Sequence, residues 1–314
     1  MPRITRPWKI VFTLLLLAAL AWGIDWREMP AHLARIDATL GMLALLIVVL
    51  EMPVNAWKWS WSLRLHDLRF PWIYLFRTAC FGFFFNNLLP SAIGGDVYRV
   101  IRTTEQASDR SRAISAVLVD RVVGLAAMLC NGLLGALVLM QTYELARWYV
   151  QAAAVGLVAL VVGFGLLYKG SGLRRKLSSI RFLQPVWDNL RRIGRPRREW
   201  LPLIATSFLF QLLAALCLYL SFAAVGAEIA WPAALLITAA AGIGSILPLS
   251  ISGIGVVEGS IAGTAVALGV DYDLAVLGAI ALRLITLPVS AACGLLYLTE
   301  SGETRAQAQR LREE

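Results

Sequence analysis

Six charged side chains lie within or at the ends of apolar segments. They are Asp96, Arg99, Asp120, Arg121, Glu258 and Arg283. A charged side chain inside a bilayer costs roughly 2.5–3.5 kcal/mol on insertion scales unless it is paired or hydrated. Arginine is planar and binds phosphate through two parallel hydrogen bonds, and a carboxylate beside it could pair with it at rest or bind an amine. The set therefore predicts a polar interior that binds a lipid head group.

Each of these residues also has a structural interpretation. The four in the first half could be interfacial residues that snorkel to the cytoplasm, and Glu258 could form a purely structural salt bridge with Arg283. Arg283 lies about ten residues, roughly 15 Å, into its apolar run, which is deep in a hydrocarbon core of about 30 Å. We therefore expect it to pair with Glu258, the nearest acid by topology. Glu51, beside Pro53, is a weaker candidate.

Two apolar segments are broken in a similar way, and Pro90 and Pro248 in the two breaks are 158 residues apart. Each break is an apolar run followed by Leu-Pro, a turn rich in serine and glycine, and an acid. The turn residues that we assign are Asn86, Asn87, Pro90, Gly94, Gly95, Pro248, Ser252, Gly253 and Gly255. Broken segments at matching places in two halves indicate inverted repeats around a midplane site. The helix after each turn would direct free N–H groups toward an anion; the alternative is that the breaks are packing kinks.

Long apolar runs predict the helices on which these residues lie. Of the 314 residues, 59% are hydrophobic and 16% are charged, whereas soluble domains are nearer 45–50% and 25%. The runs predict an all-α integral membrane protein with six spans. They lie near residues 8–24, 40–62, 113–140, 148–168, 201–225 and 274–298. The first run also fits a cleaved signal peptide, but we favour an uncleaved helix.

Basic residues set the predicted orientation. Ten Lys/Arg and one acid lie between Lys169 and Arg198, which is typical of a cytoplasmic loop that contacts anionic lipid. The N-terminus is also basic, so both termini are expected in the cytoplasm of a bacterial-type inner membrane. The broken segments 70–96 and 231–268 then enter from opposite sides as re-entrant hairpins; full crossing, with eight spans, is the alternative.

We therefore expect one polytopic domain. It consists of a first half 1–168, a basic loop 169–200, a second half 201–300 and a polar cytoplasmic tail 301–314. A short amphipathic helix is expected around Leu177–Ile193 in the loop.

Several other classes of function are not supported. The net charge is +9, but its concentration in one loop between apolar runs argues against nucleic acid. The four cysteines stand alone in apolar runs and the two histidines are far apart, so no metal site is expected. We find no Walker A or GxSxG motif, and we expect no cofactor and no enzyme activity.

The sequence resembles the lysylphosphatidylglycerol synthase transmembrane-region family of flippase-like membrane proteins. The resemblance rests on Asn87-Leu88-Leu89-Pro90, Gly94-Gly95-Asp96, Arg99, Val119-Asp120-Arg121, Gly124, Pro248, Gly253-Ile254-Gly255-Val256-Val257-Glu258 and Arg283. The family includes the flippase half of bacterial aminoacyl-phosphatidylglycerol synthases and stand-alone members associated with hopanoid, polyprenyl-lipid and glycan pathways. Because the chain after Thr299 is short, we expect no counterpart of the soluble aminoacyl-transferase domain of the bifunctional members.

These observations favour a flippase for a lipid with an anionic or aminoacylated head group. The alternative is a membrane enzyme or accessory factor of polyprenyl or hopanoid lipid synthesis, with Asp96 or Glu258 as acid/base groups and lipid-biosynthesis enzymes as partners. A structural scaffold is a third interpretation.

Overall fold

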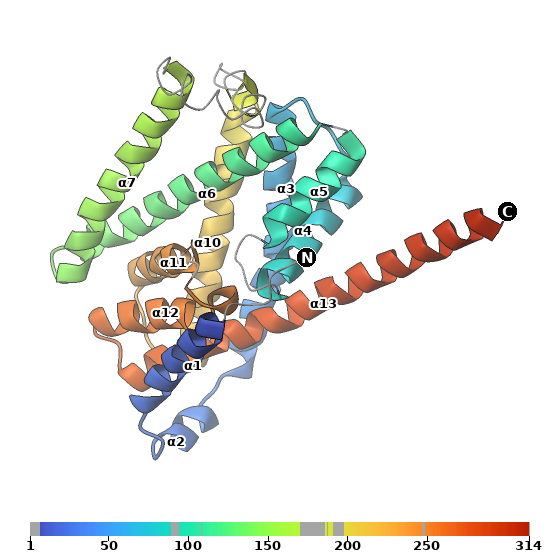
Figure 1. The fold of residues 1–314 in the computed structure, drawn as a ribbon. Helices are drawn as coiled ribbons and strands as arrows, with labels where there is room; N and C mark the ends of the chain where they lie inside the picture. Colours follow the sequence, from blue (N-terminus) through green and yellow to red (C-terminus); the bar gives the residue numbers. More distant parts are fainter. Residues whose placement is uncertain are drawn as a thin grey trace.

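The computed structural model describes residues 7–88, 94–107, 109–169, 186, 188–190, 198–246 and 249–313. Every regular element in these ranges is helical (Figure 1). The elements are α1 (Pro7–Trp22), α2 (Met29–Ala34), α3 (Ala38–Leu65), α4 (Trp72–Leu88), α5 (Gly94–Ala107), α6 (Arg110–Leu139), α7 (Glu144–Lys169), α10 (Trp200–Ala224), α11 (Trp231–Ile246), η1 (Ile251–Gly253), α12 (Val256–Ala267) and α13 (Tyr272–Glu313). Most of the basic loop and its predicted amphipathic helix lie outside the described residues.

Five described helices are long and apolar enough to cross a membrane, namely α3, α6, α7, α10 and α13. They match five of the six predicted spans. The remaining run forms α1, whose 16 residues reach about 24 Å at 1.5 Å per residue. The outer faces are apolar: Val155, Val158 and Val161 of α7 are 61–72% exposed, as expected for side chains that contact lipid. The chain is an all-α integral membrane protein.

The helices form two repeated halves. In three matching pairs of helices the first residues are 162 positions apart: Ala38 and Trp200, Gly94 and Val256, and Arg110 and Tyr272. Helices α3 and α10 run antiparallel, because Asp37 N, before α3, donates to Ala224 O at the end of α10 over 2.8 Å. At the other end of the pair, Leu65 and Leu203 share one buried cluster. The predicted repeat is therefore inverted.

Both broken segments fold as helical hairpins, α4–α5 and α11–α12 (Figure 1). The first hairpin joins the end of the bundle where α3 ends, and the second joins the end where α10 ends. Glycine allows the helices of each hairpin to approach closely: Gly82 lies against the Gly95 carbonyl, and its counterpart Gly244 lies against the Val256 carbonyl. The structure thus confirms that each segment is broken into two helices, as both the re-entrant and the fully crossing interpretations predict.

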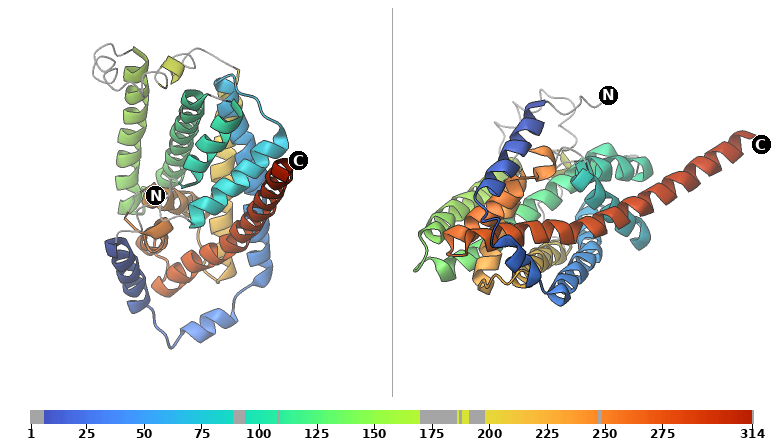
Figure 2. Two further views of the ribbon diagram at one scale, coloured as in Figure 1. Left: turned by 45° about the vertical axis from the view of Figure 1, so that its right-hand side comes forward. Right: turned by 90° about the horizontal axis from the view of Figure 1, so that it is seen from below.

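The predicted tail does not form a separate element. Ser301–Glu313 continues α13, whose C-terminal part extends away from the bundle (Figure 2). Before this extension, α13 carries Arg283 and an internal proline, Pro288.

We expect Gly95→Ala to destabilise the protein by about 1–3 kcal/mol, the usual cost of overpacking. A Cβ at Gly95 would overlap the Gly82 carbonyl oxygen and would crowd Asn86 Oδ1. Gly259→Ala, early in α12, is the control, because nothing lies within 4 Å of its added Cβ and alanine favours a helix. Thermal unfolding in detergent should show a lower midpoint for Gly95→Ala alone; equal midpoints would contradict the close packing.

Candidate functional site

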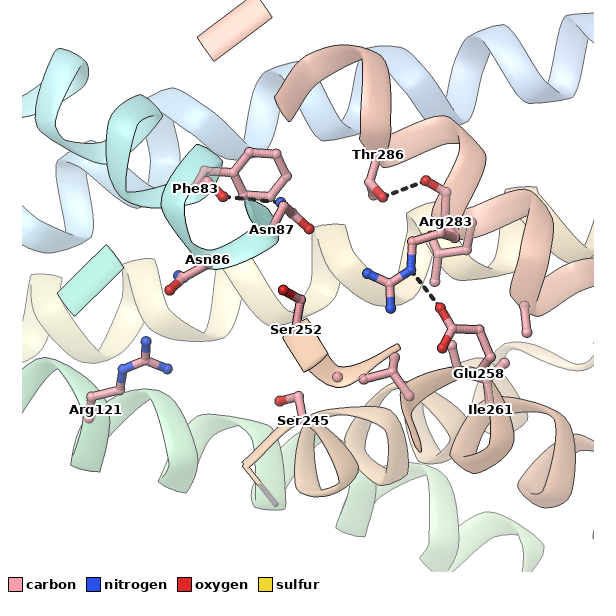
Figure 3. Close-up of a pocket in the computed structure, with 14 residues that line it drawn as sticks. Phe83, Asn86, Asn87, Arg121, Ser245, Ser252, Glu258, Ile261, Arg283 and Thr286 are labelled. Carbon is pink, nitrogen blue, oxygen red and sulfur yellow. Dashed lines mark hydrogen bonds and ion pairs between the residues drawn. The ribbon is translucent and has the colours of Figure 1, made fainter. Parts of the chain in front are cut away.

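A cavity of about 300 Å³ lies between the ends of the two hairpins (Figure 3). Residues of both hairpins, of α6 and of α13 line it. The lining residues are Phe83, Asn86, Asn87, Arg121, Ser245, Ser252, Gly253, Val257, Glu258, Ile261, Ala279, Leu282, Arg283 and Thr286. The sequence predicted that the two breaks meet around one site, and the structure brings them together here.

Two arginine–carboxylate pairs belong to this cavity. Arg121 Nε donates to Asp96 Oδ2 and Arg283 Nε donates to Glu258 Oε1, each over 2.5 Å. In both pairs the arginine follows the acid by 25 residues, and the pairs are 162 positions apart. They are equivalent positions of the inverted repeat. The expected pairing of Arg283 with Glu258 is present, whereas the Asp96–Arg121 pair was not predicted.

The acid of each pair is the third residue of the second hairpin helix. Glu258 also accepts a hydrogen bond from Gly255 N over 2.7 Å, which closes a capping box. In the first hairpin, Gly95 N donates to Asn86 Oδ1 over 2.9 Å. At each helix N-terminus, one backbone N–H is therefore already bonded to a side chain of the protein. We expect the arginines to supply most of the attraction for an anion. Gly255 has φ +84°, a conformation that favours glycine.

The arginines are more accessible than their partners. The Arg121 side chain is 52% exposed and Asp96 is 11% exposed; the values for Arg283 and Glu258 are 23% and 7%. Figure 3 shows Arg121 and Arg283 approaching from opposite sides, with Ser252 between them in this view. Among the described residues, neither guanidinium makes a further hydrogen bond. Their terminal nitrogens can therefore donate to a phosphate.

A second ionic cluster lies beside the first pair and is buried. Asp120 contacts Lys58 Nζ at 3.3 Å and Arg99 Nη1 at 3.4 Å. Arg99 also donates to Asn55 Oδ1 over 3.2 Å and lies over the Trp59 ring. Asp120 Oδ1 has no hydrogen-bond partner in the described structure despite its ion pair with Lys58, so that contact is ionic rather than a well-aligned hydrogen bond.

This cluster corrects part of the sequence analysis. Arg99 and Asp120 are 7% and 3% exposed, so neither snorkels to the surface. Lys58 and Asn55 were missed because tryptophan and proline neighbours indicated an interface or a kink. A signal was present: Glu51, Asn55, Lys58 and Ser62 follow the spacing of one helix face.

The second half has no equivalent of this cluster. The residues 162 positions after Asn55, Lys58, Arg99 and Asp120 are Cys217, Leu220, Ile261 and Leu282. The two half-sites therefore share one arginine–carboxylate pair each, and only the first carries additional charge.

The remaining predicted turn residues are distributed around the cavity. Asn86, Asn87, Ser252 and Gly253 line it, while Gly94, Gly95 and Gly255 shape the hairpins behind it. Pro90 and Pro248 lie outside the described residues. In the described part, no group of three or more His, Cys, Asp or Glu side chains could hold a metal ion.

The fold and the site define a polytopic helical membrane protein with an inverted repeat around an ionic cavity. The family model described as lysylphosphatidylglycerol synthase TM region matches residues 8–294. The chain therefore belongs to this family, which suggests a role connected with membrane lipids. No curated protein sequence matches the chain significantly.

Proposed function

We propose that the protein is a flippase-like transporter that moves lipids with a phosphate-containing head group across the inner membrane. The observation that carries this proposal is the pair of repeat-related arginines on one cavity between two hairpins. Inverted-repeat transporters typically bind their substrate at such a junction near the bilayer midplane. The head group would occupy the cavity while the tails stay in lipid.

The ion pairs suggest how a phosphate could be received and released. A phosphate that binds Arg121 or Arg283 competes with Asp96 or Glu258 for the same guanidinium. Because each carboxylate is already in place, it can re-form the pair when the lipid leaves. The unequal exposure of the two arginines, 52% and 23%, supports a cycle in which the half-sites alternate in accessibility.

Reconstitution in liposomes tests this proposal. Fluorescent phospholipids placed in both leaflets are bleached from outside by an impermeant reductant, and transport appears as loss beyond the outer-leaflet fraction. We expect faster loss with the protein than in empty vesicles or in vesicles with the Arg121→Ala, Arg283→Ala double variant. If no lipid, anionic or lysylated, moves faster than in empty vesicles, the proposal fails.

The ion pairing of the two carboxylates favours transport over catalysis. Asp96 and Glu258 are both engaged by arginine, so an acid/base role for either requires its pair to open first. Lipid mass spectrometry of a deletion strain separates the functions. A new or missing lipid species supports an enzyme, whereas unchanged species with an altered leaflet distribution supports transport.

The proposed orientation places both termini and the basic loop in the cytoplasm. Tyr143 lies at the α6–α7 connection, and the 26 residues of α7 separate it from the basic loop along the chain. Reporter fusions at Tyr143, Gly194 and Glu313 should therefore report outside, inside and inside. An inside result at Tyr143 would contradict this topology.

A further inference from the structure

We infer that the transported head group carries one net negative charge and hydroxyl groups but no amine, as in a phosphoglycerol or a glycosyl phosphodiester. This inference rests on the proposed function and narrows its substrate class. The inference distinguishes unmodified anionic lipids from aminoacylated lipids as substrates. It is argued from the charges around the described cavity and from the hydrogen bonds that the cavity side chains already make.

The charge of the site is the first observation. Its two ion pairs and the adjoining cluster contain four cations, Lys58, Arg99, Arg121 and Arg283, and three carboxylates, Asp96, Asp120 and Glu258. Within these seven described side chains the cations therefore outnumber the carboxylates by one. The hairpin-turn residues outside the description, 89–93 and 247–248, have no ionisable side chain. Glu51 makes no ion pair or hydrogen bond with this set in the described structure.

A phosphodiester with one negative charge neutralises this surplus. A zwitterionic phosphoethanolamine leaves it in place. A lysylated phosphoglycerol, with one phosphate and two ammonium groups, raises the total to two uncompensated positive charges. Because an unpaired charge is costly away from water, the site favours the anionic lipid over the lysylated one.

The carboxylates do not compensate for an added amine. Glu258 uses Oε1 for Arg283 and Oε2 for Gly255 N, and its side chain is 7% exposed. Asp96 lies behind Arg121 and is 11% exposed. The Asp120 side chain is 4% exposed and contacts two cations. No described carboxylate is thus presented to the cavity without a cation of its own.

Three neutral side chains of the cavity keep oxygen atoms that can accept hydrogen bonds, while Asn86, whose Oδ1 accepts from Gly95 N, keeps its amide as a donor. Ser245 Oγ donates to Gly242 O over 2.7 Å, and Thr286 Oγ1 donates to Arg283 O over 2.8 Å. Each hydroxyl oxygen then keeps lone pairs for a ligand. Asn87 Nδ2 donates one N–H to Phe83 O over 3.0 Å, which leaves its second N–H as a donor and its Oδ1 as an acceptor. These acceptors suit the hydroxyls of glycerol or a sugar, while the arginines bind the phosphate.

The test compares head groups on one set of labelled acyl chains in the reconstituted transport assay. The lipids are phosphatidylglycerol, phosphatidylserine, phosphatidylethanolamine and lysyl-phosphatidylglycerol. We expect phosphatidylglycerol to move at least about tenfold faster than lysyl-phosphatidylglycerol, since tenfold corresponds to about 1.4 kcal/mol. Phosphatidylserine has the same net charge as phosphatidylglycerol but carries an amine and a carboxylate, and it should be slower.

A pair of threonine variants tests the hydroxyl contacts. Thr286→Val keeps the side-chain shape and removes the acceptor from the cavity, so phosphatidylglycerol transport should fall severalfold, the usual effect of one neutral hydrogen bond. Thr238→Val is the control, because Thr238 also donates to a carbonyl of its own helix but does not line the cavity.

The outcomes distinguish this inference from the proposed function. Equal or faster movement of lysyl-phosphatidylglycerol overturns the inference and leaves a flippase. Equal movement of phosphatidylserine and phosphatidylglycerol overturns the exclusion of an amine. An unchanged rate for Thr286→Val overturns the hydroxyl contact. If none of the four lipids moves, both the proposed function and the inference fail.

Discussion

Arg283→Ala is expected to slow lipid transport about 10- to 100-fold, because a hydrogen bond to a charged group contributes about 1.5–3 kcal/mol. The variant removes the guanidinium that faces the cavity and leaves Glu258 capped by Gly255 N. Arg121→Ala should have an effect of similar size, since Arg121 occupies the equivalent position of the repeat. Arg283→Lys should be intermediate, because it keeps the charge and loses the planar donor fork. Initial rates in vesicles with equal protein content provide the measurement.

A matched control distinguishes this effect from the loss of any arginine–aspartate pair. Arg112 Nε contacts Asp109 Oδ2 at 3.0 Å at the start of α6, and neither residue lines the cavity. Arg112→Ala should keep transport near the wild-type rate. Wild-type transport by correctly inserted Arg283→Ala protein would show that Arg283 is structural, and the assignment of this half-site would be wrong.

Asp120→Asn should lower the free energy of unfolding by about 3–5 kcal/mol, the range for breaking a buried ion pair. The substitution leaves Lys58 and Arg99 as neighbouring buried cations without their shared carboxylate. Glu51→Gln is the control, since it also removes a buried carboxylate, one with no cationic partner among the described residues. Unfolding in detergent should show a large loss for Asp120→Asn and little change for Glu51→Gln. Equal losses would mean that the cluster does not depend on charge compensation.

The second half of the repeat suggests a rescue of Asp120→Asn. The counterparts of Lys58, Arg99 and Asp120 are Leu220, Ile261 and Leu282. The repeat therefore already accommodates three apolar side chains at these positions. Buried ion pairs replaced by packed hydrophobic residues are often as stable or more stable. The triple variant Lys58→Leu, Arg99→Ile, Asp120→Leu should therefore unfold at a higher temperature than Asp120→Asn alone. A still lower midpoint would contradict the equivalence of the two halves.

The sequence was sufficient to predict five of the six spans, the two hairpins and the presence of charged side chains inside the bundle, because hydrocarbon imposes strict limits on charge and on free backbone groups. It predicted the Glu258–Arg283 pair but did not pair the four charged residues of the first half. The structure pairs Asp96 with Arg121 and Asp120 with Arg99, rather than each acid with the arginine nearest to it in the sequence. Neighbouring residues on a helix point in different directions, so adjacency is a poor guide to contact. The 25-residue spacing common to both arginine–carboxylate pairs was the usable signal.

Helix α5 shows a second limit. The segment after Gly94 and Gly95 is polar and begins with two poor helix formers, so the predicted broken segment ended at residue 96 and the length of the helix after the turn was not predicted. In the structure it is a helix that packs between α4 and α6. The close approach at Gly82 and the ion pairs of Asp96 and Arg99 hold it there. Such tertiary stabilisation cannot be seen in local composition.

The proposed head-group site is tested most directly by a structure of the protein determined in nanodiscs that contain phosphatidylglycerol. We expect head-group density in the cavity between the hairpins, with the phosphate within hydrogen-bond distance of the Arg121 or Arg283 guanidinium and the Asp96 or Glu258 pair opened accordingly. Density for lipid head groups only on the outer surface, with both pairs closed under conditions in which the protein transports lipid, would contradict it.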